Sequence, residues 1–166
     1  VGRGAARLIE VALQHVVPHH GQDPQKHAVE ARLLAAFMER YQDSVCEAST
    51  VYLGVAEFVA AARNAGIRLA CVTNKPYRPA VALLEALNLL DAFELVIGGD
   101  TLAHKKPHPE PLLHCLRHFE VTAAQALMVG DSRNDVDAAK AAGVKSLALP
   151  YGYNHGEPIE ACEPDR

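Results

Sequence analysis

The sequence predicts an α/β fold: a parallel sheet in three layers, with helices on both faces, preceded by a small helical domain. From about residue 50 onward, short apolar stretches alternate with helical patterns, which indicates consecutive βα units. The stretches LACVT (69–73) and ALMV (126–129) are apolar at nearly every position, which is typical of strands covered on both faces. Residues 1–49 contain helical patterns and no strand pattern.

Two helices are expected in the first domain, which we predict to span residues 1–49. Apolar residues recur at helical spacing over residues 5–16, and Pro18 and Gly21 follow as helix-ending residues. A second helical pattern covers residues 24–41, with its apolar side chains on one side.

The second predicted domain spans residues 50–166 and alternates helices with strands. Gly66 and Gly143 each stand between a helical pattern and a strand pattern, where a left-handed residue commonly ends a helix. Helices are expected over residues 54–65, 79–89, 109–118 and 134–142. Strands are expected over residues 67–74, 93–100, 126–131 and 144–150.

Composition and charge exclude several classes of protein. Apolar residues make up 49% of the chain and charged residues 22%, which is the balance of a globular domain. The net charge of -4 gives no basic surface for nucleic acid, and no apolar run approaches the length of a membrane span. The four cysteines are widely spaced without a CxxC pair, so a reducing, cytoplasmic location is expected. The sequence leaves open whether the protein is a monomer or a homodimer.

Polar side chains follow three of the predicted strands. Thr73 and Asn74 end the first strand, Lys106 lies in the loop after the second, and Asp131 and Asp135 follow the third. Ligands of an open parallel sheet bind beyond the carboxyl ends of its strands. We therefore expect these side chains to converge at one edge of the sheet.

These residue types suit a phosphoryl group held with a divalent cation. Thr73 offers a hydroxyl, Asn74 an amide and Lys106 a positive charge to phosphate oxygens. Mg²⁺ prefers oxygen ligands and usually takes one or two carboxylates, so Asp131 is a candidate ligand. Asp135 lies about one helical turn further on, where it can bind the ion, bind a metal-bound water or orient Lys106.

Each of these residues also has a simpler interpretation. Thr73 can be a turn residue at a strand end, and Lys106 a solvated lysine before a proline. Asp131 can N-cap the next helix, and Asp135 can be an acid favoured by the helix dipole. Their joint occurrence, in this order on successive strand ends, favours the phosphate site.

Three stretches resemble the motifs of the haloacid dehalogenase-like hydrolase superfamily. VTN (72–74) is similar to its second motif, in which a serine or threonine ends a strand. KKPHPEP (105–111) is similar to its third, and MVGDSRNDVDAA (128–139) to its fourth, in the GDxxxD form. The residues around these motifs resemble most those of the bacterial phosphoglycolate phosphatase branch.

The resemblance implies a Rossmann-like core preceded by a helical cap domain. It also implies Mg²⁺-dependent hydrolysis of a small phosphorylated metabolite, 2-phosphoglycolate, through an aspartyl-phosphate intermediate. The residue roles that it implies are catalysis by Thr73 and Lys106, substrate binding by Asn74, and metal binding by Asp131 and Asp135.

The superfamily's first motif, DxDGTL, does not occur in the 166 residues. In the family, this motif carries the nucleophilic aspartate on the middle strand of the sheet. We therefore expect these residues to belong to a longer protein, and the 166-residue polypeptide by itself to be inactive.

A few other residues are candidates for contact with a ligand. Arg3 offers a fork that matches a substrate carboxylate, although a plain surface arginine is the simpler interpretation. His104 and His108 flank the lysine of the third motif and either line the mouth of the site or merely sit on its loop. Gly152 and Tyr153 follow the last strand, and the sequence assigns them no role.

Other functions remain open at this stage. A sugar-phosphate phosphatase or a phosphomutase of the same superfamily would use the same motifs, and a non-catalytic phosphate-binding module would keep the fold. A dehalogenase is less favoured because its chemistry has no need of a GDxxxD metal site. A nicotinamide-binding domain is disfavoured because no GxGxxG sequence follows a strand.

Overall fold

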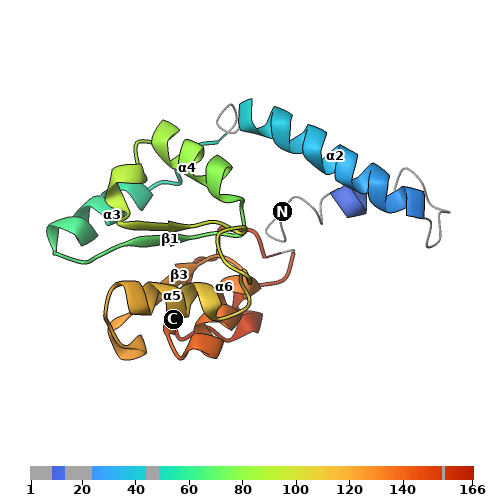
Figure 1. The fold of residues 1–166 in the computed structure, drawn as a ribbon. Coiled ribbons are helices and arrows are strands. Elements are labelled where there is room, and N and C mark those ends of the chain that lie inside the picture. Colours follow the sequence, from blue (N-terminus) through green and yellow to red (C-terminus); the bar gives the residue numbers. More distant parts are fainter. Residues whose placement is uncertain (1–8, 14–23, 44–48, 155) are drawn as a thin grey trace.

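A computed structural model describes residues 9–13, 24–43, 49–154 and 156–166 of the chain. From residue 55 onward, helices and strands alternate as predicted (Figure 1). The helices are α2 (Pro24–Asp43), α3 (Val55–Asn64), α4 (Tyr77–Ala86), α5 (Glu110–His118) and α6 (Arg133–Ala142). The strands are β1 (Ala70–Val72), β2 (Leu95–Ile97), β3 (Leu127–Gly130) and β4 (Lys145–Ala148). Short 3₁₀ helices cover Leu90–Ala92, Ala123–Gln125 and Ile159–Cys162.

The four strands form two parallel pairs. β1 pairs with β2 in a register that places Val72 opposite Ile97, and β3 pairs with β4 with Gly130 opposite Ala148. Each pair is a separate two-stranded sheet within the described residues. The sequence predicted one parallel sheet whose middle strand, by the family resemblance, belongs to the motif that the 166 residues lack. The α/β class with parallel strands is confirmed.

Helices cover the strands on two sides. In Figure 1, α3 and α4 lie on one side of the β1–β2 pair, and α5 and α6 lie on the other. The main core cluster joins Leu112 of α5 to the alanines of α6, among them Ala138 and Ala139, which are fully buried. These small side chains let the two helices approach closely, and Val72 and Met128 of the strands pack against the same cluster.

The two helix-ending glycines adopt the predicted backbone conformation. Gly66 has a φ of 74° after α3, and Gly143 has a φ of 69° after α6. Residues other than glycine rarely adopt this left-handed region. Each glycine therefore ends its helix, and a strand or an extended segment follows.

Helix α4 begins two residues earlier than its proline pattern predicted. The carboxylate of Asp100 accepts a hydrogen bond of 2.6 Å from the backbone N–H of Tyr77, which satisfies one of the free donors at the helix start. Pro79 then lies in the first turn, where its missing N–H costs no intrahelical bond. The capping acid comes from the turn after β2, a contact that local sequence does not indicate.

Residues 1–49 are helical wherever the structure describes them, except at Ser49. The helical part comprises residues 9–13 and α2, which extends two residues beyond its predicted end. Helix α2 projects from the rest of the chain and contacts α4 (Figure 1). The division into a cap at 1–49 and a core at 50–166 stays a prediction. No described helix is both long enough and apolar enough to span a membrane.

Candidate phosphate and metal site

A buried ion pair stands at the carboxyl end of β1. The Nζ of Lys106 lies 2.6 Å from the Oδ1 of Asp135 and also donates a hydrogen bond to the backbone carbonyl of Val72. Only 8% of Lys106 and 5% of Asp135 are exposed to solvent. The loop after β2 thus delivers a lysine to the end of β1, while the start of α6 supplies its counter-charge. The two residues were predicted to meet, and they do.

The electrostatics of Asp135 are governed by burial and by its donors. Burial alone raises the pKa of this carboxyl, but the charge of Lys106 and the hydrogen bonds from Lys106, Ser132 and the backbone of Asp131 outweigh it. The pKa therefore lies below its ordinary value, and Asp135 is ionised at neutral pH. Because both charges are removed from water, each depends on the other for compensation.

The second carboxylate oxygen of Asp135 organises the start of α6. Its Oδ2 accepts hydrogen bonds from the backbone N–H groups of Asp131 (3.2 Å) and Ser132 (3.0 Å) and from the hydroxyl of Ser132 (2.7 Å). Ser132, not Asp131, is the N-cap residue, so the simpler capping interpretation of Asp131 is wrong. A Cβ at Gly130 would collide with the Asp135 side chain, which explains the glycine of the Gly-Asp sequence.

Of the three roles that the sequence left open for Asp135, these contacts match the orientation of Lys106. Both of its carboxylate oxygens are engaged by donors of the chain. A direct bond to a metal ion would have to displace such donors. Metal ligation by Asp135 therefore stays a prediction that the observed contacts do not favour.

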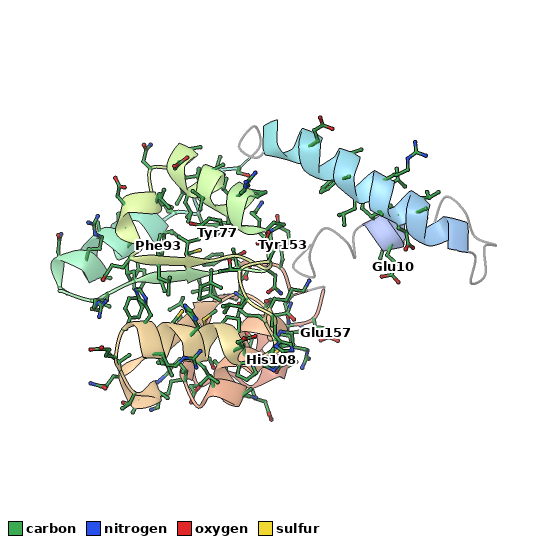
Figure 2. All side chains as sticks on the ribbon, viewed as in Figure 1. Glu10, Tyr77, Phe93, His108, Tyr153 and Glu157 are labelled. Carbon is green, nitrogen blue, oxygen red and sulfur yellow. The ribbon has the colours of Figure 1, made fainter. Side chains whose placement is uncertain are left out.

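Asp131 is half-buried at the end of β3 and faces the loop that follows β4. Its Oδ2 accepts a hydrogen bond of 3.0 Å from the backbone N–H of Tyr153. A Cβ at Gly152 would overlap the Asp131 carboxylate, so only glycine fits this close approach. Figure 2 shows Tyr153 at the end of the core where the strands terminate. Gly152 and Tyr153 are thus site residues to which the sequence assigned no role.

The same loop is fixed to the start of α6 by a buried asparagine. The Oδ1 of Asn154 accepts a hydrogen bond of 2.8 Å from the backbone N–H of Arg133, and its Nδ2 donates to the carbonyl of Glu157. Asn154 is 8% exposed. It holds the loop against α6 and thereby helps to set the position of Gly152 beside Asp131. A polar residue in a loop carries no sequence signal of this role.

The surroundings of Asp131 fit a Mg²⁺ ion. Among the described residues, its carboxylate accepts a single hydrogen bond, which leaves lone pairs on both oxygens for a cation. Gly152 has no side chain, so the loop after β4 packs closely against that carboxylate and fixes its position. An oxygen donor of this kind is what a hard divalent cation prefers.

Thr73 and Asn74 lie next to the lysine, at the end of β1. The Thr73 hydroxyl oxygen accepts a hydrogen bond of 3.1 Å from the backbone N–H of Lys75, so its O–H proton remains able to donate. The side-chain amide of Asn74 donates 2.9 Å to the carbonyl of Lys106. The side-chain amide of Asn74 therefore holds the loop that carries Lys106. The sequence offered either the backbone or the side-chain amide of Asn74 to a phosphate, and binding by Asn74 stays a prediction.

The predicted substrate-binding residue Arg3 lies outside the described residues. The other five predicted site residues lie along the ends of β1 and β3, joined by the Lys106–Asp135 pair.

We expect the substitution Gly152→Ala to displace Asp131. The added methyl group would collide with the carboxylate, at a cost of about 1–3 kcal/mol in unfolding free energy if the site does not adjust. Mg²⁺ should bind more weakly, because the added methyl group either displaces the Asp131 carboxylate or crowds it. Calorimetric titration of the full-length protein with Mg²⁺ measures this affinity. The control is Glu157→Ala, which removes an exposed ion pair from the same loop. Equal Mg²⁺ affinity in Gly152→Ala and the unsubstituted protein would contradict the assignment.

The chain is similar in sequence to known proteins of one family. The sequence profile of the haloacid dehalogenase-like hydrolases matches residues 4–149. A phosphoglycolate phosphatase of Nitrosococcus oceani is 43% identical over 165 residues, covering 99% of this chain and 72% of that protein. A phosphoglycolate phosphatase of Pseudomonas putida is 44% identical, covering 99% of this chain and 59% of that protein. This chain therefore spans between about three fifths and three quarters of the lengths of these two relatives.

Solved structures show the same fold. The crystal structure of a predicted phosphoglycolate phosphatase from Haemophilus somnus superposes with a TM-score of 0.85 at 31% identity, covering 99% of this chain and 73% of that one. CbbY from Rhodobacter sphaeroides, solved in complex with phosphate, superposes with a TM-score of 0.74 at 30% identity, covering 93% and 68%. The resemblance drawn from the three motifs is confirmed: the chain belongs to the haloacid dehalogenase-like hydrolases.

Proposed function

We propose that this protein is a Mg²⁺-dependent phosphomonoesterase and that 2-phosphoglycolate is its substrate. The observation that supports this proposal most is the buried Lys106–Asp135 pair at the end of β1, beside Thr73 and near the carboxylate of Asp131. Relatives named phosphoglycolate phosphatase are 43% and 44% identical to the chain over nearly its whole length. Their names support 2-phosphoglycolate as the substrate.

Lys106 and Thr73 bind the oxygens of the transferring phosphoryl group in this proposal. The Lys106 ammonium is held in one position by Val72 and Asp135, so it needs no reorganisation when charge develops on the phosphoryl oxygens. Thr73 adds a hydroxyl donor beside it. Asn74 acts indirectly, by fixing the loop that carries the lysine.

Asp131 would hold the Mg²⁺ ion. When bound, the ion would neutralise charge on the phosphoryl group and orient it. Asp135 keeps Lys106 ionised and in place. The backbone N–H of Tyr153 and the cradle at Gly152 hold the Asp131 carboxylate in its orientation.

The nucleophile in this scheme is an aspartate that the 166 residues do not supply in a recognisable motif. It would attack phosphorus and form an aspartyl-phosphate, which water then hydrolyses. We further propose that the strand that carries it lies between β1 and β3. Neither of these strands pairs with the other, and Leu127 of β3 is 55% exposed, which is high for a leucine of a central strand. The 166-residue polypeptide alone should therefore be inactive.

Residues 1–49 would act as the cap, and contacts from this helical segment would select the leaving group. Arg3 is our candidate for the substrate carboxylate. We also propose a cytoplasmic location, with which the free thiols of Cys71, Cys115 and Cys162 agree.

The proposal predicts substrate preference as well as activity. With saturating Mg²⁺, the full-length protein should release phosphate from 2-phosphoglycolate with a higher kcat/KM than from any member of a panel of sugar phosphates. Arg3→Ala should raise KM for 2-phosphoglycolate, and Arg7→Ala is the control within the same segment. A higher kcat/KM for a sugar phosphate would support the assignment as a phosphatase and contradict 2-phosphoglycolate as the substrate.

A further inference from the structure

Two histidines and a glutamate cluster in and next to the loop that carries Lys106. His104 and His108 lie in the segment between β2 and α5, and Glu110 is the first residue of α5. One ligand atom from each of the three side chains lies within 4.8 Å of the others. The two histidines are exposed and Glu110 is half-buried, and Figure 2 shows His108 at the end of the core where the strands terminate.

We propose that His104, His108 and Glu110 form a binding site for a transition-metal ion of the zinc class. Two imidazoles and one carboxylate are a donor set that suits Zn²⁺, and this set leaves a fourth position for water. Tetrahedral coordination with bonds of about 2.0–2.1 Å needs donor atoms about 3.3 Å apart. Donor atoms that are now up to 4.8 Å apart therefore have to approach one another by up to about 1.5 Å.

The backbone that carries these ligands is already fixed. Lys106, between the two histidines, is buried and bonded to Val72 and Asp135, and its carbonyl accepts a hydrogen bond from Asn74. The backbone N–H of His104 donates 2.8 Å to the Oε2 of Glu110. Metal binding would order exposed side chains on a rigid support, so little backbone entropy is lost on binding.

The side chains have to rearrange, and their exposure allows it. The rings of His104 and His108 are stacked, with centroids 4.0 Å apart and planes inclined by 20°. Stacked rings do not direct their lone pairs at a common point, so at least one ring has to rotate when an ion binds. The side chain of His104 is 58% exposed, so this rotation meets no packed core.

The proposed site differs in chemistry from the one at Asp131. Imidazole nitrogen suits zinc-class ions, whereas Mg²⁺ prefers oxygen alone. Excess Mg²⁺ should therefore fill the Asp131 site and leave the histidine cluster available to Zn²⁺. The alternative is that the cluster has only a structural role. In that case the 2.8 Å contact between His104 and Glu110 stabilises the loop that carries Lys106 and binds no ion.

Titration of the full-length protein with Zn²⁺ in saturating Mg²⁺ tests the proposal. We expect one calorimetric binding event that is weakened at least about tenfold in both His108→Gln and Glu110→Gln. The control is His118→Gln, since His118 is an exposed histidine at the far end of α5. The proposal would be contradicted by unchanged Zn²⁺ affinity in His108→Gln, or by no Zn²⁺ binding to the unsubstituted protein. Either result would favour the purely structural role of the His104–Glu110 contact.

Co²⁺ absorption provides a second readout. A tetrahedral Co²⁺ site should give visible d–d bands in the unsubstituted protein and in His118→Gln, and these bands should be missing in His108→Gln. If other histidines bind the metal ion, the same signal should remain in every variant, including His108→Gln. That result would distinguish binding elsewhere from binding at the proposed site. Neither measurement uses phosphatase activity, so failure of the proposed function and failure of this site remain distinguishable.

Discussion

Asp135→Asn is expected to lower the unfolding free energy of the full-length protein by about 3–5 kcal/mol. The substitution leaves the ammonium of Lys106 buried without its counter-charge, and only 8% of Lys106 is exposed. It also alters an oxygen that accepts hydrogen bonds from Ser132 and from the backbone of Asp131. Urea unfolding of both proteins measures the difference.

The loss should depend on pH with a defined sign. The pKa of Asp135 is lower in the folded protein than its ordinary value of 3.8. Its stabilising contribution is therefore fully present above about pH 4 to 5 and is lost as the pH falls through the folded-state pKa. The difference between the unsubstituted protein and Asp135→Asn should shrink with acid. Asp137→Asn, two residues further along α6, is the control, and an equal effect of both substitutions at neutral pH would contradict the buried-pair account.

Asp131→Asn is expected to reduce Mg²⁺-dependent phosphate release at least about 100-fold while the fold is retained. The amide oxygen of asparagine can still accept the hydrogen bond from the backbone N–H of Tyr153, so unfolding free energy should fall by less than about 1.5 kcal/mol. The negative charge that attracts the cation is lost. The measurement is kcat over a range of Mg²⁺ concentrations in the full-length protein, beside the same Asp137→Asn control.

Two results would oppose this role of Asp131. Activity within about threefold of the unsubstituted protein at every Mg²⁺ concentration would show that the carboxylate does not hold the ion. Global unfolding of Asp131→Asn would show that its hydrogen bond to the loop after β4 is mainly structural. Thermal unfolding, recorded on the same samples, separates these two cases.

Much of the fold follows from periodic patterns and from glycine. Apolar runs at 69–73 and 126–129 mark two of the strands, and Gly66 and Gly143 end helices because they adopt positive φ values. The meeting of Lys106 with Asp135 was also predictable. Parallel strands bring their carboxyl ends to one edge, so residues 29 positions apart in sequence converge there.

Contacts between distant loops were not predictable in the same way. Gly152 and Tyr153 contact Asp131 from 21 and 22 positions away in the sequence, and nothing in the local sequence indicates these contacts beyond a glycine after a strand. The early start of α4 likewise depends on Asp100, a capping acid from another loop. Hydrophobic periodicity locates the four strands but does not show which of them pair, and the strand that we propose between β1 and β3 belongs to a motif absent from the 166 residues.

The most direct test of the central claim is phosphate release from 2-phosphoglycolate by the full-length protein, measured with Mg²⁺ and again after chelation. If the edge formed by Thr73, Lys106 and Asp131 is a Mg²⁺-dependent phosphatase site, release should occur with Mg²⁺, stop on chelation and return when Mg²⁺ is restored. Release that continues undiminished in chelator, or no release from any phosphomonoester with Mg²⁺ present, would contradict the claim.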